Sequence, residues 1–245
     1  MSFDGIVVKS LVAELREKLI DTKIDKVYQP EKDEVCLKIR SKEGVYKLLL
    51  SASASHPRVY IANKYEKSNP KKAPVFCMTL RKYIQGGVIV DIGQVGFERI
   101  IKISVESYDE LREKPRKDLY IEIMGKHSNI ILLDRTSNKI IEAIKHVGFS
   151  QNSYRTILPG STYVAPPKTD AVNPFTIGDE ALFALLHKEE LSPKNLQKCF
   201  QGLGRDTAQE LAKRLETDEK LKTFRAFFKA PSEPRLTTKS FSAIP

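Results

Sequence analysis

Apolar and polar residues alternate along much of the first 143 residues. In KDEVCLKIR, Val35, Leu37 and Ile39 occupy every second position, which predicts a strand with one buried face. Short turns separate most such segments, so the pattern favours a largely antiparallel sheet or sandwich over βαβ units. The strands are predicted at residues 24–29, 34–40, 45–50, 58–62, 88–92, 99–105, 119–124, 129–133 and 140–143.

Helical periodicity interrupts this part twice and dominates the rest of the chain. Leu11, Leu15 and Leu19 predict a helix over residues 10–18, and another is expected over residues 75–85, before a Gly-Gly pair. After the proline-rich connector LPGSTYVAPP, helices are predicted at residues 175–187, 193–200, 205–215 and 219–228.

These patterns predict an α+β protein of two domains. The β-rich domain is expected over residues 1–170 and an all-α domain over residues 171–230. Residues 231–245 begin another alternating pattern, which we interpret as the start of a following segment that is cut short.

Positive charge is concentrated in the β-rich part. The chain holds 41 Lys and Arg against 31 Asp and Glu, a formal net charge of +10. Residues 171–245 contain 12 basic and 10 acidic residues, so residues 1–170 contain the remaining 29 and 21, a net of +8. This excess favours an anionic partner, most often a nucleic acid.

Several classes of function find no support. Cys36, Cys77 and Cys199 form no CxxC pair and are expected to be reduced thiols. The four histidines show no metal-binding spacing, and there is no nucleophile elbow or phosphate-binding loop. We therefore expect no catalytic residue, metal or cofactor. No apolar run approaches the ~18 residues of a membrane span, and no signal-peptide profile is seen, so a cytoplasmic location is expected.

The clearest local motif is FQGLGRDTAQELAKRL at residues 200–215. Gly202, Gly204 and Ala208 match a helix-hairpin-helix pattern, in which glycines permit positive φ and close approach. Free N–H groups at the start of the second helix can hold a phosphate, and Arg205 is placed there. An ordinary helix–helix turn with a glycine cap is the alternative.

Two further candidates lie in the β-rich part. The stretch from residue 64 to residue 82 is rich in cations, and Tyr65, Phe76 and the following Tyr83 could stack on bases. The alternative is a solvated loop followed by a helix whose aromatics belong to the core. Glu98 and Arg99 lead into a strand. Arg99 can hold a phosphate or a guanine edge, whereas Glu98 can position Arg99 or accept from a base amine. The alternative is a surface strand start. The cations of the first stretch are Lys64, Lys67, Lys71, Lys72, Arg81 and Lys82.

Four stretches, MSFDG, GKHSNIILLD, RTILPGSTYVAPP and GLGRDTAQEL, occur in this order. Together they resemble the N-terminal NFACT module of the bacterial RqcH / fibronectin-binding protein A-like family, which has NEMF among its eukaryotic relatives. The resemblance spans essentially the whole chain. It implies a β-rich domain similar to MutM-type DNA glycosylases, followed by a helix-two-turn-helix (helix-hairpin-helix) domain. Those glycosylases use an N-terminal proline that this chain lacks, so their lyase chemistry is not expected.

The resemblance also implies a role in ribosome quality control. Family members bind the large ribosomal subunit with an obstructed peptidyl-tRNA, and bacterial members recruit alanyl-tRNA for untemplated alanine tailing. The family's acidic-Arg pair falls on Glu98 and Arg99, with Glu where Asp is usual, and Asp4 is a weaker candidate for a second functional acid. We therefore expect a non-enzymatic tRNA- and ribosome-binding module. The expected tRNA contacts are Glu98, Arg99, Lys64, Lys71, Lys72, Arg81, Lys82 and Lys126.

The polar cluster GKHSN at residues 125–129 is expected to shape a turn or to support an RNA-facing edge. Lys126 could meet phosphate, while His127 and Asn129 would tie the turn through side-chain-to-backbone bonds. Consecutive strand residues face opposite sides, so the cluster does not predict a catalytic set. Two alternative functions are a fibronectin-binding adhesin and a DNA-binding relative of the glycosylases.

Overall fold

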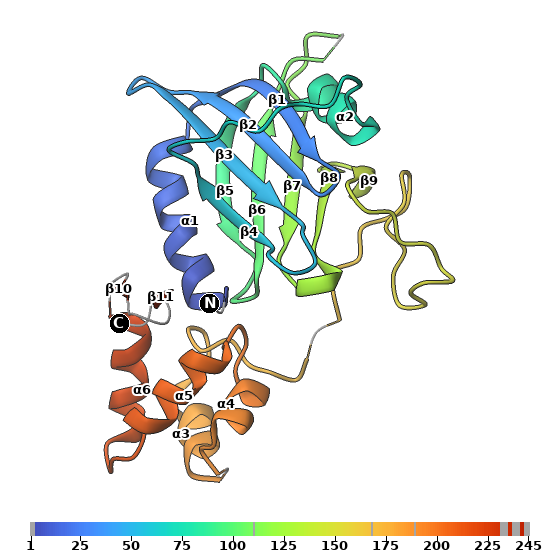
Figure 1. Cartoon of the computed structure of the whole chain (residues 1–245). Coiled ribbons are helices and arrows are strands. Elements are labelled where there is room, and N and C mark those ends of the chain that lie inside the picture. Colours follow the sequence, from blue (N-terminus) through green and yellow to red (C-terminus); the bar gives the residue numbers. More distant parts are fainter. Residues whose placement is uncertain are drawn as a thin grey trace. The chain divides into compact units, whose positions relative to one another are not determined.

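The computed structural model describes residues 3–109, 111–167, 169–188 and 190–230, together with the short strands β10 (Arg235–Leu236) and β11 (Phe241–Ser242). The chain divides into two compact units, which Figure 1 shows in the colours of the sequence. Unit 1 contains residues 1–10, 94–99 and 167–245, and unit 2 contains residues 11–93 and 100–166. The boundary predicted near residue 170 lies close to residue 167, and two short segments from earlier in the chain, residues 1–10 and 94–99, also belong to unit 1.

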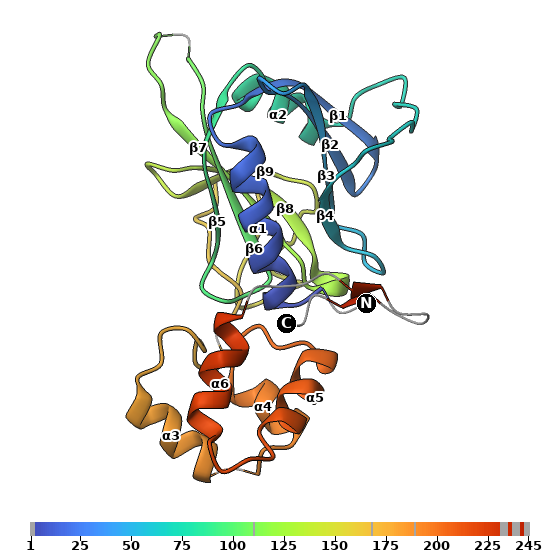
Figure 2. The ribbon, with the colours of Figure 1, turned by 90° about the vertical axis from the view of Figure 1, so that its left-hand side faces the viewer.

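An antiparallel sheet dominates unit 2, as the alternating pattern predicted. Its order is β4-β3-β2-β1-β5-β6-β7-β8-β9. Lys23 of β1 pairs with Val88 of β5, and the Ile24 N–H donates to the Gly87 carbonyl beside this pair at 2.9 Å. Figures 1 and 2 show β1–β4 and β5–β9 as two layers. The strands are β1 (Lys23–Glu31), β2 (Glu34–Arg40), β3 (Val45–Ser51), β4 (Arg58–Ile61), β5 (Val88–Gln94), β6 (Ile100–Glu106), β7 (Arg116–Glu122), β8 (Asn129–Asp134) and β9 (Lys139–Ala143).

Apolar side chains fill the interior of unit 2. The alternating residues Leu37 and Ile39 of β2 are fully buried, as the sequence predicted. Helix α2 (Val75–Ile84) buries Phe76, Leu80 and its last residue and packs against β1 and β9. Cys36 and Cys77 are buried free thiols, and burial raises the pKa of Cys36 to about 11. Cys199 is partly buried.

Helix α1 (Gly5–Leu19) begins earlier than its leucine spacing indicated. The carboxylate of Asp4 accepts hydrogen bonds from the backbone N–H groups of Ile6 (3.1 Å) and Val7 (3.2 Å). Such an N-cap satisfies donors that have no partner inside the helix. The predicted start at Ser10 was wrong because leucine periodicity reports the buried stripe and not the cap.

Four helices follow in unit 1: α3 (Asp179–Lys188), α4 (Pro193–Cys199), α5 (Arg205–Arg214) and α6 (Lys220–Lys229). All four were predicted, but α3 begins at Asp179 and not at Phe175, since Asn173 organises a turn by accepting from the Phe175 N–H (2.9 Å). The helix-hairpin-helix and MutM-like assignments remain predictions. Within the described ranges, no helix is long and apolar enough to cross a membrane.

An aromatic cluster forms the core of unit 1. Phe97, which comes from the segment 94–99, is buried with its ring centroid 5.0 Å from that of Phe175 and 6.0 Å from that of Phe228. Phe224 packs between Phe200 and Phe228, with centroid separations of 4.7 Å and 4.8 Å. Edge-on and tilted rings at these distances are favourable arrangements. Phe97 therefore joins the segment 94–99 to the helices.

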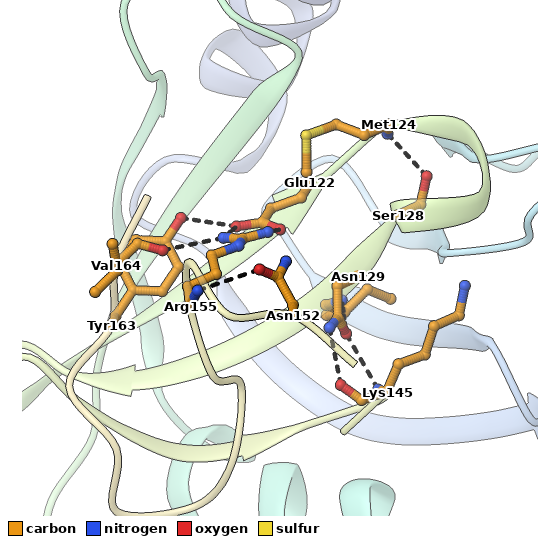
Figure 3. Close-up of polar contacts among 10 residues, drawn as sticks. Glu122, Met124, Ser128, Asn129, Lys145, Asn152, Arg155, Tyr163 and Val164 are labelled. Carbon is orange, nitrogen blue, oxygen red and sulfur yellow. Dashed lines mark hydrogen bonds and ion pairs between the residues drawn. The ribbon is translucent and has the colours of Figure 1, made fainter. Parts of the chain in front are cut away.

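A buried ion pair holds the connector of unit 2 against β7 (Figure 3). Arg155 donates two parallel hydrogen bonds to the carboxylate of Glu122, at 2.8 Å and 2.6 Å, and Tyr163 donates a third at 2.9 Å. Arg155 also donates to the Val164 carbonyl at 3.0 Å. Because the Glu122 side chain is fully buried, its charge depends on these donors.

Replacing Arg155 with Met should therefore strongly destabilise unit 2. The variant leaves a buried carboxylate without its cation, which costs about 3–5 kcal/mol of unfolding free energy. Urea unfolding followed by circular dichroism measures the loss. Combining Arg155→Met with Glu122→Gln should recover part of it, because the amide is neutral and still accepts from Tyr163. Equal losses in the single and double variants would count against this account.

Candidate nucleic-acid interface

Two predicted sites that are far apart in the sequence line one pocket of unit 1. Glu98 and Arg99 come from the segment after β5, while the glycine turn and Arg205 come from the α4–α5 connection. The prediction had placed them in different domains. The pocket has a volume of about 370 Å³ and is lined by Asp4, Glu98, Arg99, Thr169, Ala171, Gln197, Phe200, Gln201, Gly202, Leu203, Gly204 and Arg205.

The turn that carries Glu98 is held by backbone contacts. Gln94 donates from its side-chain amide to the carbonyls of Gly5 (3.0 Å) and Glu98 (2.9 Å). The Glu98 N–H donates to the Val95 carbonyl at 3.1 Å. The buried Phe97 ring anchors the same turn in the aromatic core. The Glu98 backbone is thus held in position without use of its carboxylate.

The glycine turn needs glycine for two reasons. Gly202 has φ +70°, and a Cβ there would overlap the carbonyl oxygen of Phe97. A Cβ on Gly5 would lie 2.7 Å from the same oxygen, and the Gly5 N–H donates to the Gly202 carbonyl at 2.6 Å. Gly204 differs, since it is an extended N-cap of α5 with φ −75°. Positive φ and close approach, which the motif predicted, are confirmed at Gly202.

Asp4 holds the N-termini of two helices together. One carboxylate oxygen caps α1, and the other accepts from the Gly204 N–H (3.2 Å) and from the Thr207 hydroxyl. Burial raises the pKa of Asp4, and the hydrogen bonds from Thr207, Val7, Gly204 and Ile6 oppose that rise. Because these internal donors engage both oxygens, Asp4 positions the pocket, and its carboxylate already holds the Gly204 N–H that the motif offered to a phosphate.

Three charged groups in the pocket lack partners within the described part of the chain. The half-buried carboxylate of Glu98 and the exposed guanidinium groups of Arg99 and Arg205 make no hydrogen bond or ion pair there. Desolvation raises the pKa of Glu98, and the charge of Arg99 partly offsets this. Arg205 is the first residue of α5, where the helix dipole favours anions. The two guanidinium groups can bind a phosphate, and the Glu98 carboxylate can accept a hydrogen bond from a base amine.

The other predicted cations all belong to unit 2 and do not line this pocket. Arg81 is half-buried, and its Nε donates to the Val27 carbonyl at 3.0 Å, so it secures α2 against β1. The remaining lysines of the predicted set are exposed: Lys64, Lys71, Lys72, Lys82 and Lys126.

Two of the three aromatic residues that were predicted to stack on bases have structural roles instead. Phe76 is only 4% exposed and belongs to the core. Tyr65 donates its hydroxyl to Glu34 at 2.7 Å, and Lys67 pairs with the same carboxylate at 2.8 Å. Burying the Glu34 carboxylate requires these partners, so both residues have a structural role. Tyr83 is half-buried and is the third aromatic of that stretch.

The GKHSN cluster is a structural turn with an exposed tip (Figure 3). Ser128 accepts from the Met124 N–H at 2.8 Å, and Asn129 bonds both the carbonyl (2.8 Å) and the N–H (3.1 Å) of Lys145. Asn129 makes the predicted kind of side-chain-to-backbone bond, but its bonds join the start of β8 to Lys145 and do not close the turn. The role assigned to His127 was wrong: Ser128 ties the turn, whereas His127 and Lys126 are exposed.

Thr169 and Gln197 also line the pocket and were not predicted. Each is an isolated polar residue outside any recognisable motif. Gln197 donates from its amide to the Leu203 carbonyl at 3.2 Å, which supports the glycine turn. No signal in the sequence could have marked them, since their position depends on the fold of unit 1.

The unpartnered carboxylate should cost stability at neutral pH. Because the pKa of Glu98 is raised in the folded chain, its contribution to stability is present below the unfolded pKa and is lost as pH rises through the folded pKa. We expect Glu98→Gln to raise the unfolding free energy at pH 7 and to bring little change near pH 4. Urea titrations at both pH values measure this. A loss of stability at pH 7 would show that Glu98 has a stabilising partner.

The chain matches the family of NFACT N-terminal and middle domains over residues 4–242. It is 54% identical over 245 residues to the Rqc2 homolog RqcH of Streptococcus suis, covering 100% of this chain and 44% of that protein. The Rqc2 homolog RqcH of Bacillus subtilis is 43% identical over 216 residues, covering 87% and 38%. The chain thus spans less than half the length of these relatives.

A solved structure shows the same fold. The N-terminal part of the fibronectin/fibrinogen-binding protein from Streptococcus suis matches with a TM-score of 0.94 and 54% identity, covering 100% of this chain and 91% of that one. The agreement includes both units, because it extends over the full chain. The family match, the identities and this fold lead to one conclusion: the chain belongs to the family of NFACT N-terminal and middle domains.

Proposed function

We propose that this chain is the tRNA-binding part of a ribosome quality control factor. The similarity to Rqc2 homologs supports the quality-control role. The proposed partners are a tRNA, with alanine tRNA as the expected species, and a large ribosomal subunit carrying an obstructed peptidyl-tRNA in the cytoplasm. The proposed role is to position the tRNA, in keeping with the expectation of a non-enzymatic module.

The observation that carries the proposal is the set of unpartnered charges in the Glu98 pocket. A guanidinium group without an internal partner costs little to transfer to a phosphate or a base edge, because no existing ion pair has to be broken. Within the part of the chain that the structure describes, Arg99 and Arg205 both lack such a partner. The Glu98 carboxylate would repel a phosphate but can accept a hydrogen bond from a base amine. The three groups together favour a nucleotide over a simple anion.

Affinity and placement are assigned to different residues. The excess positive charge of residues 1–170 favours binding to any RNA through counterion release. The exposed lysines Lys64, Lys71, Lys72, Lys82 and Lys126 are proposed to contact phosphates in this way. Glu98 and Arg99 are proposed to orient one part of the tRNA, because base contacts and not phosphate contacts carry sequence information.

The double variant Glu98→Ala/Arg99→Ala should bind alanine tRNA about tenfold more weakly or worse, since each bidentate arginine contact contributes about 1–3 kcal/mol. Filter binding at fixed ionic strength measures the loss. The matched control is Lys42→Ala/Glu43→Ala, which removes an adjacent cation and acid from an exposed turn and leaves the net charge equally unchanged. Equal affinity of the two double variants would refute the assignment of the pocket.

Fibronectin binding is a second candidate, supported by the name of the Streptococcus suis structure. The two functions differ in their salt dependence. If contact with fibronectin is only charge-driven, the surface plasmon resonance signal should fall steeply between about 50 and 200 mM salt because exposed charges are screened. We expect this fall. A saturable signal that persists at high salt would instead support specific adhesion.

A further inference from the structure

A second pocket lies in unit 2, between the C-terminal end of α2 and the β6–β7 connection. Its volume is about 640 Å³. It shares no residue with the Glu98 pocket, and all its lining residues belong to unit 2. They are Lys82, Tyr83, Ser107, Tyr108, Asp109, Leu111, Pro115 and Lys117. We call it the Tyr83–Tyr108 pocket.

Apolar surface is exposed to water at this pocket. Tyr108 is 69% exposed and Leu111 is 80% exposed, while Tyr83 is half-buried. Single exposed apolar residues are common, but here two aromatic rings and a leucine line the same hollow. A flat, partly apolar ligand would cover this surface, and a tyrosine ring offers a stacking platform to any nucleobase.

Cations surround the rings. The Lys82 Nζ lies 5.4 Å from the centroid of the Tyr83 ring, and the Lys114 Nζ lies 4.8 Å from that of Tyr108. Both lysines are exposed, and neither forms an ion pair with a carboxylate in the described part of the chain. Lys117 is 5.9 Å from the Tyr83 centroid but is paired with Asp134 at 2.5 Å. Lys82 and Lys114 thus place two exposed cations beside the rings, where they can meet an anionic group.

Hydrogen bonds among its described residues order the loop that carries Tyr108. Asp109 accepts from the backbone N–H groups of Leu111 and Glu113, both at 2.9 Å. Ser107 donates its hydroxyl to the Tyr83 carbonyl at 2.6 Å, which ties the loop to α2. The Asp109 carboxylate is therefore engaged with its own loop. An organised loop loses less conformational entropy on binding.

We propose that the Tyr83–Tyr108 pocket binds an unpaired nucleobase together with its phosphate, within a single-stranded nucleic acid. The base stacks on the tyrosine rings, and Lys82 and Lys114 move from the ring faces to the phosphate. An acidic peptide would use the lysines but would gain nothing from the rings. This site goes beyond the proposed tRNA contact at Glu98, because different residues in the other unit form it.

The test uses the full chain and a fluorescein-labelled ten-nucleotide single-stranded RNA. Tyr108→Ala should weaken binding at least about fivefold in fluorescence anisotropy, the effect of losing one base–aromatic stack. Tyr108→Phe should bind like the unchanged chain because the ring remains. The matched control is Tyr154→Ala, which removes a tyrosine 55% exposed and outside the pocket. Wild-type affinity in Tyr108→Ala, or an equal loss in the control, overturns the proposal.

Competition identifies the group that is bound. Adenosine monophosphate should displace the RNA at lower concentration than ribose 5-phosphate, because only the former carries a base that can stack. Equal competition by the two phosphates would reduce the site to an anion contact and overturn the proposal.

The variants also separate this proposal from the tRNA assignment. Tyr108→Ala should weaken binding of the short RNA more than Glu98→Ala/Arg99→Ala does, and the order of the two effects should be reversed for tRNA. If the short RNA instead depends on Glu98 and Arg99 and not on Tyr108, the pocket proposal fails and the tRNA assignment stands. If Tyr108→Ala weakens short-RNA binding but the double variant keeps its tRNA affinity, the pocket proposal stands and the tRNA assignment fails.

Discussion

The carboxylate of Asp4 is the contact on which the Glu98 pocket depends. It satisfies two backbone donors at the start of α1 and two donors at the start of α5, so one buried side chain serves two helix N-termini. Burial disfavours its charge, while these hydrogen bonds and the positive ends of two helix dipoles favour it. The neighbouring bond between the Gly5 N–H and the Gly202 carbonyl requires two residues without Cβ atoms. Together these contacts hold the N-terminal segment against the glycine turn.

Two kinds of charge can be distinguished in the molecule. Glu122, Arg155 and Tyr163 form a group in which the buried carboxylate has its donors, and such groups stabilise a fold only while they are complete. The Glu98 backbone is held by Gln94 and by the Val95 carbonyl, while the side chains of Glu98 and Arg99 lack hydrogen-bond and ion-pair partners in the described structure. A raised pKa at Glu98 is the cost of that arrangement. Groups without partners among the described residues are available to a ligand, and this is the basis of the proposed role of the pocket.

The two proposed nucleic-acid contacts use different physics. The Glu98 pocket offers directed polar groups, which discriminate between ligands by the match of donors and acceptors. The Tyr83–Tyr108 pocket offers tyrosine ring faces on which any base can stack, with exposed lysines beside them. The Glu98 backbone is tied by Gln94 and by its own turn, so its position does not depend on contacts of the carboxylate.

The sequence by itself determined the local elements of this protein. Alternation located the strands, helical spacing located the helices, and the glycine pattern indicated the positive φ of Gly202, because each depends on residues close together in the chain. Tertiary structure alone decided that Glu98 and Arg99 join Arg205, that Asp4 caps two helices, and that Phe76 belongs to the core. These outcomes depend on which distant segments bury their surfaces together. Local periodicity shows that a residue has a buried or exposed side, but it does not show which partner covers it.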